Sequence, residues 1–279
     1  MKRMILTGIL AIGAGVPCIM AQAPPAAQAA KAPAPKSKSE LEALQALQAA
    51  GGDPDKSIAA AENLITKFAD TDFKGIALYI EADAYQKKSA TPGTTPADRA
   101  LFTDRMLIFA ERVLEVSPQD FRAMLMLANY YAAHTRENDL DREEKLGKVE
   151  KYATQVIEMM KTAPKPNAQV TDAQWDEARK DSTAESYNYI GLANLTRKKY
   201  DVAAANFKSA VDANSQPEPA YMVREASALQ AGGKNDEAIA LCDKITAIPN
   251  VFPQIKNVTA AVRAAAVKAG GKAPGGEAK

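Results

Sequence analysis

Small and hydrophobic residues recur at fixed intervals in the stretch from Tyr187 to Ile245. Two sets of four residues have the same internal spacing, with offsets of 12, 16 and 19 from the first member, and the sets are displaced by 35 residues. The first set is Gly191, Ala203, Phe207 and Ala210, and the second is Ala226, Ala238, Cys242 and Ile245. A period of this length is typical of stacked helical hairpins, none of which buries its apolar face alone. Two helices approach to about 8–10 Å only where bulky side chains are absent. We therefore expect one helix crossing at Gly191 and Ala203, and an equivalent one at Ala226 and Ala238.

A helical period of apolar residues continues over the rest of residues 37–269. Ser37 followed by Glu40 predicts a capping box that starts the first helix, and Gly51–Gly52 ends it. Later helices are expected to begin near six positions: Asp53 or Asp55, Asp72, Pro96 or Ala97, Asp141, Thr171, and Phe252 or Pro253.

Two of these helices carry specific predictions about burial. The helix from Pro96 is expected to bury the following apolar residues: Leu101, Met106, Phe109, Ala110, Val113 and Leu114. The last helix is expected to cap the array, with one face in water, and to run through Ile255, Val258, Val262 and Val267. Residues 172–196 fit one long helix or two that break near Ser182–Thr183, and we favour one. No run of residues has the alternation of a strand, so the pattern predicts an all-α chain.

The repeated residues resemble those of the tetratricopeptide repeat, a helix–turn–helix of about 34 residues. The residues that match its pattern are Tyr187, Ile190, Gly191, Tyr200, Ala203, Phe207 and Ala210, then Ala226, Leu229, Gly233, Ala238 and Ile239. Asn194 and Cys242 stand where the family usually has aromatic residues. Glu225 occupies a usually apolar position, so either that hairpin is rotated or the frame slips by one residue there. The resemblance covers about two thirds of the chain and is specific over residues 184–248.

This resemblance implies a right-handed α-solenoid of about five hairpins followed by a C-terminal capping helix. Proteins of the family bind peptides or other proteins in a concave groove, which the first helix of each hairpin lines. Carried onto this sequence, the groove contains ten residues: Tyr79, Asp83, Arg122, Leu125, Asn129, Glu185, Asn188, Leu192, Val223 and Ser227. Asn129 and Asn188 are the strongest candidates, because an amide side chain both donates to and accepts from a peptide backbone.

The amino terminus has the layout of a secretory signal peptide over residues 1–21. Lys2 and Arg3 precede an apolar run that is shorter than the ~20 residues of a membrane-spanning helix. Cleavage is expected near Ala21 or Ala23, which predicts an exported protein, periplasmic or secreted, without a stable membrane span. An Ala/Pro-rich disordered linker is expected over residues 22–36, and a flexible tail over residues 270–279.

Composition narrows the chemistry further. If Cys18 leaves with the signal peptide rather than carrying a lipid, Cys242 is the sole cysteine and no intrachain disulfide forms. Removal of the signal peptide leaves 33 basic and 34 acidic residues, a balance that does not favour nucleic acid. His134 is the single histidine, so a site that needs two imidazoles is excluded. We find no phosphate loop or calcium loop, and expect no cofactor and no metal.

These features predict a non-catalytic scaffold or adaptor of the bacterial cell envelope that binds a peptide or partner protein. One alternative is a periplasmic assembly factor or chaperone for envelope or pilus components. A second is an enzyme whose site is assembled from scattered carboxylates. The sequence identifies neither the partner nor the oligomeric state.

Overall fold

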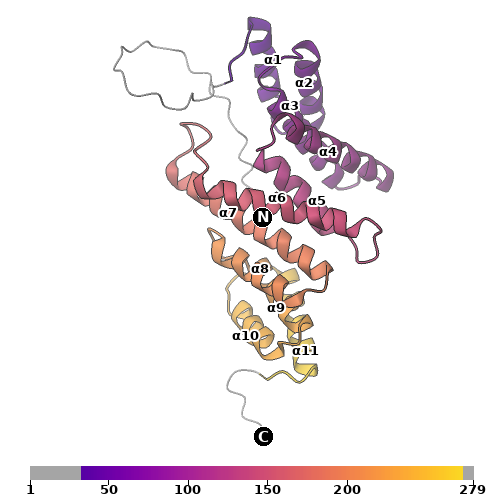
Figure 1. Cartoon of the computed structure of the whole chain (residues 1–279), viewed down its shortest axis with the longest axis vertical. Coiled ribbons are helices and arrows are strands. Elements are labelled where there is room, and N and C mark those ends of the chain that lie inside the picture. The colour runs from indigo at the N-terminus through magenta and orange to yellow at the C-terminus, as the bar shows by residue number, and fades with distance from the viewer. Residues whose placement is uncertain (1–32, 273–279) are drawn as a thin grey trace. The chain divides into compact units, whose positions relative to one another are not determined.

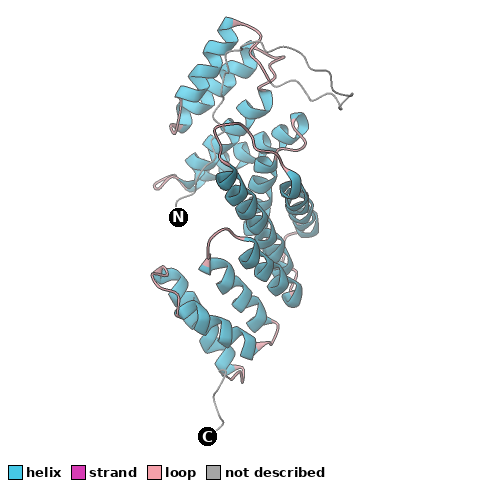
Figure 2. Cartoon of the chain, turned by 90° about the vertical axis from the view of Figure 1, so that its left-hand side faces the viewer, coloured by secondary structure: helices cyan, strands magenta, loops and turns pink. Residues whose placement is uncertain are grey.

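The computed structural model describes residues 33–272, in which the chain forms eleven α-helices and no strand (Figures 1 and 2). The predicted all-α fold is confirmed for this part of the chain. The helices are α1 Lys38–Ala49, α2 Pro54–Lys67, α3 Lys74–Ala90, α4 Pro96–Val116, α5 Phe121–His134, α6 Arg142–Thr162, α7 Asp172–Thr196, α8 Tyr200–Ala213, α9 Pro219–Ala231, α10 Asn235–Thr246 and α11 Pro253–Lys268.

Several predictions about the termini concern residues that lie outside the described part. These are the signal peptide, Cys18, most of the expected linker, and residues 273–279 of the expected tail. Among the described residues, no helix is both long enough and apolar enough to cross a bilayer.

The chain divides into two compact units, Met1–Ala123 and Met124–Lys279. In the first unit α1 packs on α2, α2 on α3 and α3 on α4. The apolar cluster that joins its first three helices contains Ala43, Leu44, Leu47, Ala61, Leu64, Phe73 and Ala77. Each helix thus packs on the next along the chain, as in a helical repeat.

The start of α1 is tied to the loop before α3. Half of the predicted capping box is present: Ser37 Oγ accepts a hydrogen bond from the Glu40 amide at 3.1 Å, whereas the Glu40 side chain bonds to the Lys36 amide instead of the Ser37 amide. The buried Glu40 carboxylate accepts a hydrogen bond from the Lys36 amide at 2.6 Å. It accepts a second from the Thr71 hydroxyl, also at 2.6 Å, so this carboxylate links two segments of the unit.

In the second unit consecutive helices from α6 to α11 pack on one another, and α11 also returns to α9. The eight residues that recur in the sequence are all buried, which confirms the predicted core faces of α7 to α10. A Cβ atom on Gly191 would lie 2.6 Å from Cε1 of Phe207. The Phe207 ring therefore occupies the space that the missing side chain leaves on α7.

Residues 172–196 form one helix, α7, whose capping box of Thr171 and Gln174 is complete. Both the favoured single helix and its predicted start are confirmed. Trp175 is buried near the start of this helix, and its indole N–H donates to the Ala163 carbonyl at 2.9 Å.

One residue that was predicted to pack in the core is exposed instead, and two apolar residues of the last helix also face water. Leu101 is 51% exposed, because the helical period places Phe102, not Leu101, in line with Met106, Phe109 and Val113. On α11, Val258 is 41% and Val267 is 47% exposed. The buried residues of α11 are Thr259 and Ala266, each adjacent in sequence to one of these two valines and hence about 100° away around the helix.

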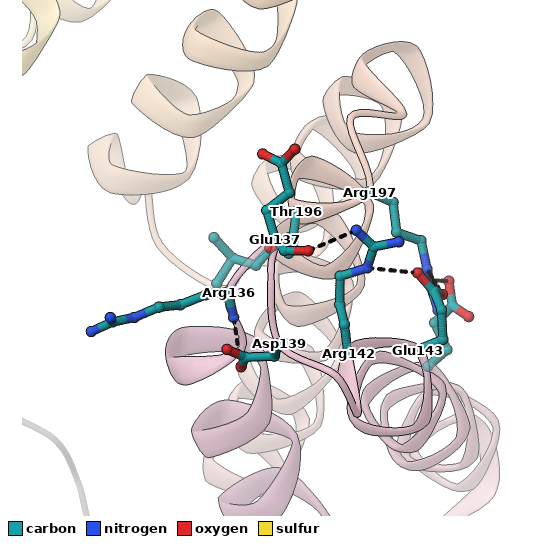
Figure 3. A network of polar contacts seen from close by, with 9 residues as sticks. Arg136, Glu137, Asp139, Arg142, Glu143, Thr196 and Arg197 are labelled. Atoms are coloured by element: carbon teal, nitrogen blue, oxygen red, sulfur yellow. Dashed lines mark hydrogen bonds and ion pairs between the residues drawn. The ribbon is translucent and has the colours of Figure 1, made fainter.

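A polar network fixes the end of α7 to α6 (Figure 3). Arg197, whose side chain is 11% exposed, donates from Nε to Glu143 at 2.8 Å and from Nη1 to Glu150 at 2.7 Å. Arg142 donates from Nε to Glu143 at 2.9 Å and from Nη1 to the Glu137 carbonyl at 2.9 Å, which holds the loop between α5 and α6. One guanidinium thus bridges two carboxylates that lie seven residues, or about two turns, apart on α6.

We predict that Gly191→Ala lowers the free energy of unfolding by about 1–3 kcal/mol, because its Cβ collides with the Phe207 ring. This cost exceeds the ~0.5–1 kcal/mol that alanine gains over glycine inside a helix. Gly147→Ala is the matched control, since nothing lies within 4 Å of its added Cβ in α6. Urea denaturation should show destabilisation by the first change and slight stabilisation by the second. Equal stabilisation by both would contradict the close contact.

We also predict that Arg197→Lys costs about 1–2 kcal/mol, because an ammonium group cannot reproduce the two-pronged geometry toward Glu143 and Glu150. Arg263→Lys makes the same change at a pair with Asp243 whose two side chains are both exposed. Its effect should stay below ~0.5 kcal/mol. Thermal and urea denaturation of the two variants measure the difference, and equal losses would show that Arg197 contributes no more than a surface pair.

Candidate interaction surfaces

The predicted groove residues of the first unit are Tyr79 and Asp83 on α3 and Arg122 at the start of α5. The Arg122 guanidinium lies over the Tyr79 ring, 4.2 Å from its centroid. It also donates from Nη2 to Asp120 at 2.5 Å and from Nε to the same carboxylate at 3.1 Å. Asp83 forms an ion pair with Lys87 of its own helix at 2.6 Å. The structure therefore brings Tyr79 and Arg122 together, whereas Asp83 pairs with a lysine of its own helix.

In the second unit, Asn188 on α7 contacts Arg224 on α9. Asn188 is 3% exposed, and its Oδ1 accepts a hydrogen bond from Nη1 of Arg224. These helices are the first members of the two hairpins that the sequence predicts with the clearest repeat. The contact therefore joins a predicted groove residue of one hairpin to a residue of the next hairpin that the sequence did not single out. The buried Asn188 acts mainly in holding α7 to α9, and Arg224 is its more accessible partner.

The other predicted residues of α7 and α9 differ in exposure. Val223 is buried, and its carbonyl accepts a hydrogen bond from Ser227 Oγ at 2.8 Å. Leu192 is partly buried against the apolar cluster around Phe207. Glu185 is partly exposed, one turn before Asn188.

The predicted residues of α5 that fall in the second unit are Leu125 and Asn129, and both are partly exposed. Their separation of four residues puts them on the same side of the helix. Of the two asparagines that the sequence singles out, Asn129 is thus the more exposed.

Sequence reasoning missed a group of charged residues that act on Tyr221. Burial raises the pKa of Tyr221 on α9, and the carboxylates of Glu185 and Glu218 raise it further, with a smaller effect of Asp181. Arg224 opposes them. Asp181, Glu185 and Glu218 define the acidic cluster, whose three carboxylates all act on the Tyr221 hydroxyl. The sequence did contain one signal of the contact between Asn188 and Arg224. Their spacing of 36 residues is close to the repeat period.

A second missed residue is Glu81 on α3, which is 1% exposed. Its Oε1 atom has no hydrogen-bond partner in the described part of the chain. Loss of hydration raises the pKa of this carboxyl to about 7, and the negative charge of Glu62 on α2 adds to the shift. Arg112 and Arg105 on α4 oppose it. Glu81 follows the buried Leu78 by three residues, so the helical period did place it on the core face.

Residues 33–272 contain no group of three or more His, Cys, Asp or Glu side chains placed to hold a metal ion. A comparison with models of known protein families finds no match, and a comparison with curated proteins finds none either. The resemblance to the tetratricopeptide repeat therefore depends on the residues of this chain alone.

We predict that burial of Glu81 makes the stability of the first unit depend on pH. Because its folded pKa is raised above the unfolded value of about 4.5, the folded state is favoured fully below pH ~4.5 and loses stability up to pH ~7. The loss reaches at most ~3 kcal/mol. Glu81→Gln should remove this part of the pH profile of urea denaturation, and the variant should be more stable than the parent at pH 8.

The charged groups that act on Glu81 are Glu62, Arg105 and Arg112, together with the neighbouring Tyr85 on α3. All are retained in the variant. Glu42→Gln, at an exposed position of α1, is the matched control and should leave the profile unchanged. Parallel profiles for the parent and Glu81→Gln would show that the carboxyl is hydrated in solution.

Proposed function

We propose that this chain is a non-catalytic interaction protein of the bacterial cell envelope, exported by its N-terminal signal peptide. Tetratricopeptide-like hairpins form a right-handed solenoid of about five repeats, which α11 caps. A partner polypeptide binds along the first helices of the hairpins. The all-helical fold of the described residues supports this proposal, as do the packing of consecutive helices from α1 to α4 and from α6 to α11 and the burial of every repeated small residue.

The observation that carries the proposal is the contact of α7 with α9 through Asn188 and Arg224. In a stacked array the first helices of successive hairpins line one surface, and a side-chain bond between them is the local sign of that arrangement. The acidic cluster acts on Tyr221, which precedes Arg224 by three residues on α9. A surface with more carboxylates than guanidinium groups favours a basic segment, because complementary charge speeds association and excludes acidic competitors. We therefore propose a partner segment that contains lysine or arginine.

The proposal predicts that charge reversal at Glu185 disrupts partner capture. Crosslinking in intact cells, with the exported protein as bait, should recover a partner whose amount falls about tenfold or more for Glu185→Lys, since tenfold corresponds to 1.4 kcal/mol. Glu237→Lys is the matched control, because this exposed glutamate lies on α10, the second helix of its hairpin. Equal capture by the parent and both variants, or capture lost only with Glu237→Lys, would overturn the proposed surface.

A further inference from the structure

The first unit contains a cavity of about 310 Å³ whose walls come from α2, α3 and α4. Its apolar lining consists of Ile58 and Ala59 on α2, Tyr85 on α3, and Leu101 and Phe102 on α4. Leu101 is half exposed at this site. The volume is at the lower end of the 300–1,000 Å³ of small-molecule pockets, which fits one large side chain rather than an extended ligand.

The rings that border the cavity continue into the core of the unit. Tyr85 lies 6.3 Å from Phe102 and 5.7 Å from Phe109, measured between ring centroids. These separations are within the range in which aromatic rings attract one another. An aromatic ring in the cavity would extend this row of three rings, and would gain both apolar burial and ring–ring contact.

The charges at the cavity cancel. Asp55 on α2 forms an ion pair with Lys88 on α3, and the Lys88 ammonium also lies 4.8 Å from the centroid of Phe102. Glu62 on α2 and Arg105 on α4 line the same cavity. A ligand with a net charge would therefore gain from one pair of groups and lose to the other. The cavity favours a neutral occupant.

Glu62 and Arg105 line the cavity, and neither forms a hydrogen bond or ion pair with another residue in the described part of the chain. When ionised, the Glu62 carboxylate can only accept hydrogen bonds, and the Arg105 guanidinium can only donate them. A peptide group satisfies both, since its N–H donates and its C=O accepts. One neutral polypeptide segment thus supplies an aromatic ring for the cavity, an N–H donor for Glu62 and a C=O acceptor for Arg105.

We propose that this cavity binds a neutral aromatic side chain of a partner polypeptide, with Glu62 accepting from a flanking peptide N–H and Arg105 donating to a flanking peptide C=O. The site is in the first unit and shares no residue with the surface of α7 and α9. The inference therefore stands or falls separately from the proposed function.

The test uses saturation-transfer NMR of the full-length chain with N-acetyl-tryptophanamide, which carries one neutral aromatic ring and two amide groups. We expect saturable binding with a dissociation constant on the order of 1 mM. Ala59→Leu, which fills the cavity from an exposed position, should weaken binding at least tenfold. Ala46→Leu makes the same change at an exposed position of α1 and should leave binding unchanged. Absence of saturable binding, or equal binding by all three proteins, would overturn the proposal.

Three further probes define the chemistry of the occupant. N-acetyl-leucinamide lacks the ring, N-acetyl-tryptophan carries a negative charge, and N-acetyl-lysinamide carries a positive charge. Each should bind at least threefold more weakly than N-acetyl-tryptophanamide. Tighter binding of the lysine probe would overturn the proposal in favour of a cation site at Asp55 and Glu62, and tighter binding of the acid would do so in favour of an anion site at Arg105.

Discussion

The contact between the Phe207 ring and the bare backbone of Gly191 is the tightest constraint in the second unit. Phe207 belongs to α8 and Gly191 to α7, so the separation of these two helices is determined by one aromatic ring lying directly on a helix backbone. The same ring belongs to an apolar cluster with residues of α9, α10 and α11. The position of α8 against α7 also sets the orientation of the α8 face on which the later helices pack, because close-packed interiors do not adjust continuously.

The end of the second unit depends on this cluster too. Ala266 of α11 is fully buried within it, and α11 contacts both helices of the preceding hairpin. After α11 the chain passes Gly271, where a Cβ would lie 2.8 Å from Ile239 of α10. The Lys272 amide then donates to Asp236 at 2.6 Å. A helix that contacts two others, followed by a segment bonded to α10, covers an apolar face that would otherwise be open to water.

The sequence predicted the order of the helices well, because capping residues and apolar spacing act locally. Thr171 with Gln174 and Ser37 with Glu40 are examples in which a cap requires only neighbours three residues away. Burial was predicted less well at helix ends. Leu101 is apolar, yet it lies outside the line of residues that face α3, and its neighbours in space were needed to show this.

Surface assignments were harder still, since they depend on contacts between segments far apart in the chain. A repeat offset places Asn188 on the first helix of a hairpin, but it does not reveal that Arg224 will cover its amide. In the same way, the spacing of Glu81 from Leu78 indicates a core position. Only the structure shows that one carboxylate oxygen there lacks a partner.

The two buried glutamates of the first unit show how similar burial leads to different roles. Glu40 accepts hydrogen bonds from Lys36 and Thr71, so its carboxylate serves as a structural link. Glu81 is equally buried but leaves one oxygen unsatisfied, an arrangement that typically costs about 1–3 kcal/mol. The charges that act on it include Glu62 and Arg105, which also line the cavity. A ligand that engages Glu62 and Arg105 would change the electrostatic field at Glu81. The free-energy cost of burying Glu81 would thereby be coupled to occupation of the cavity.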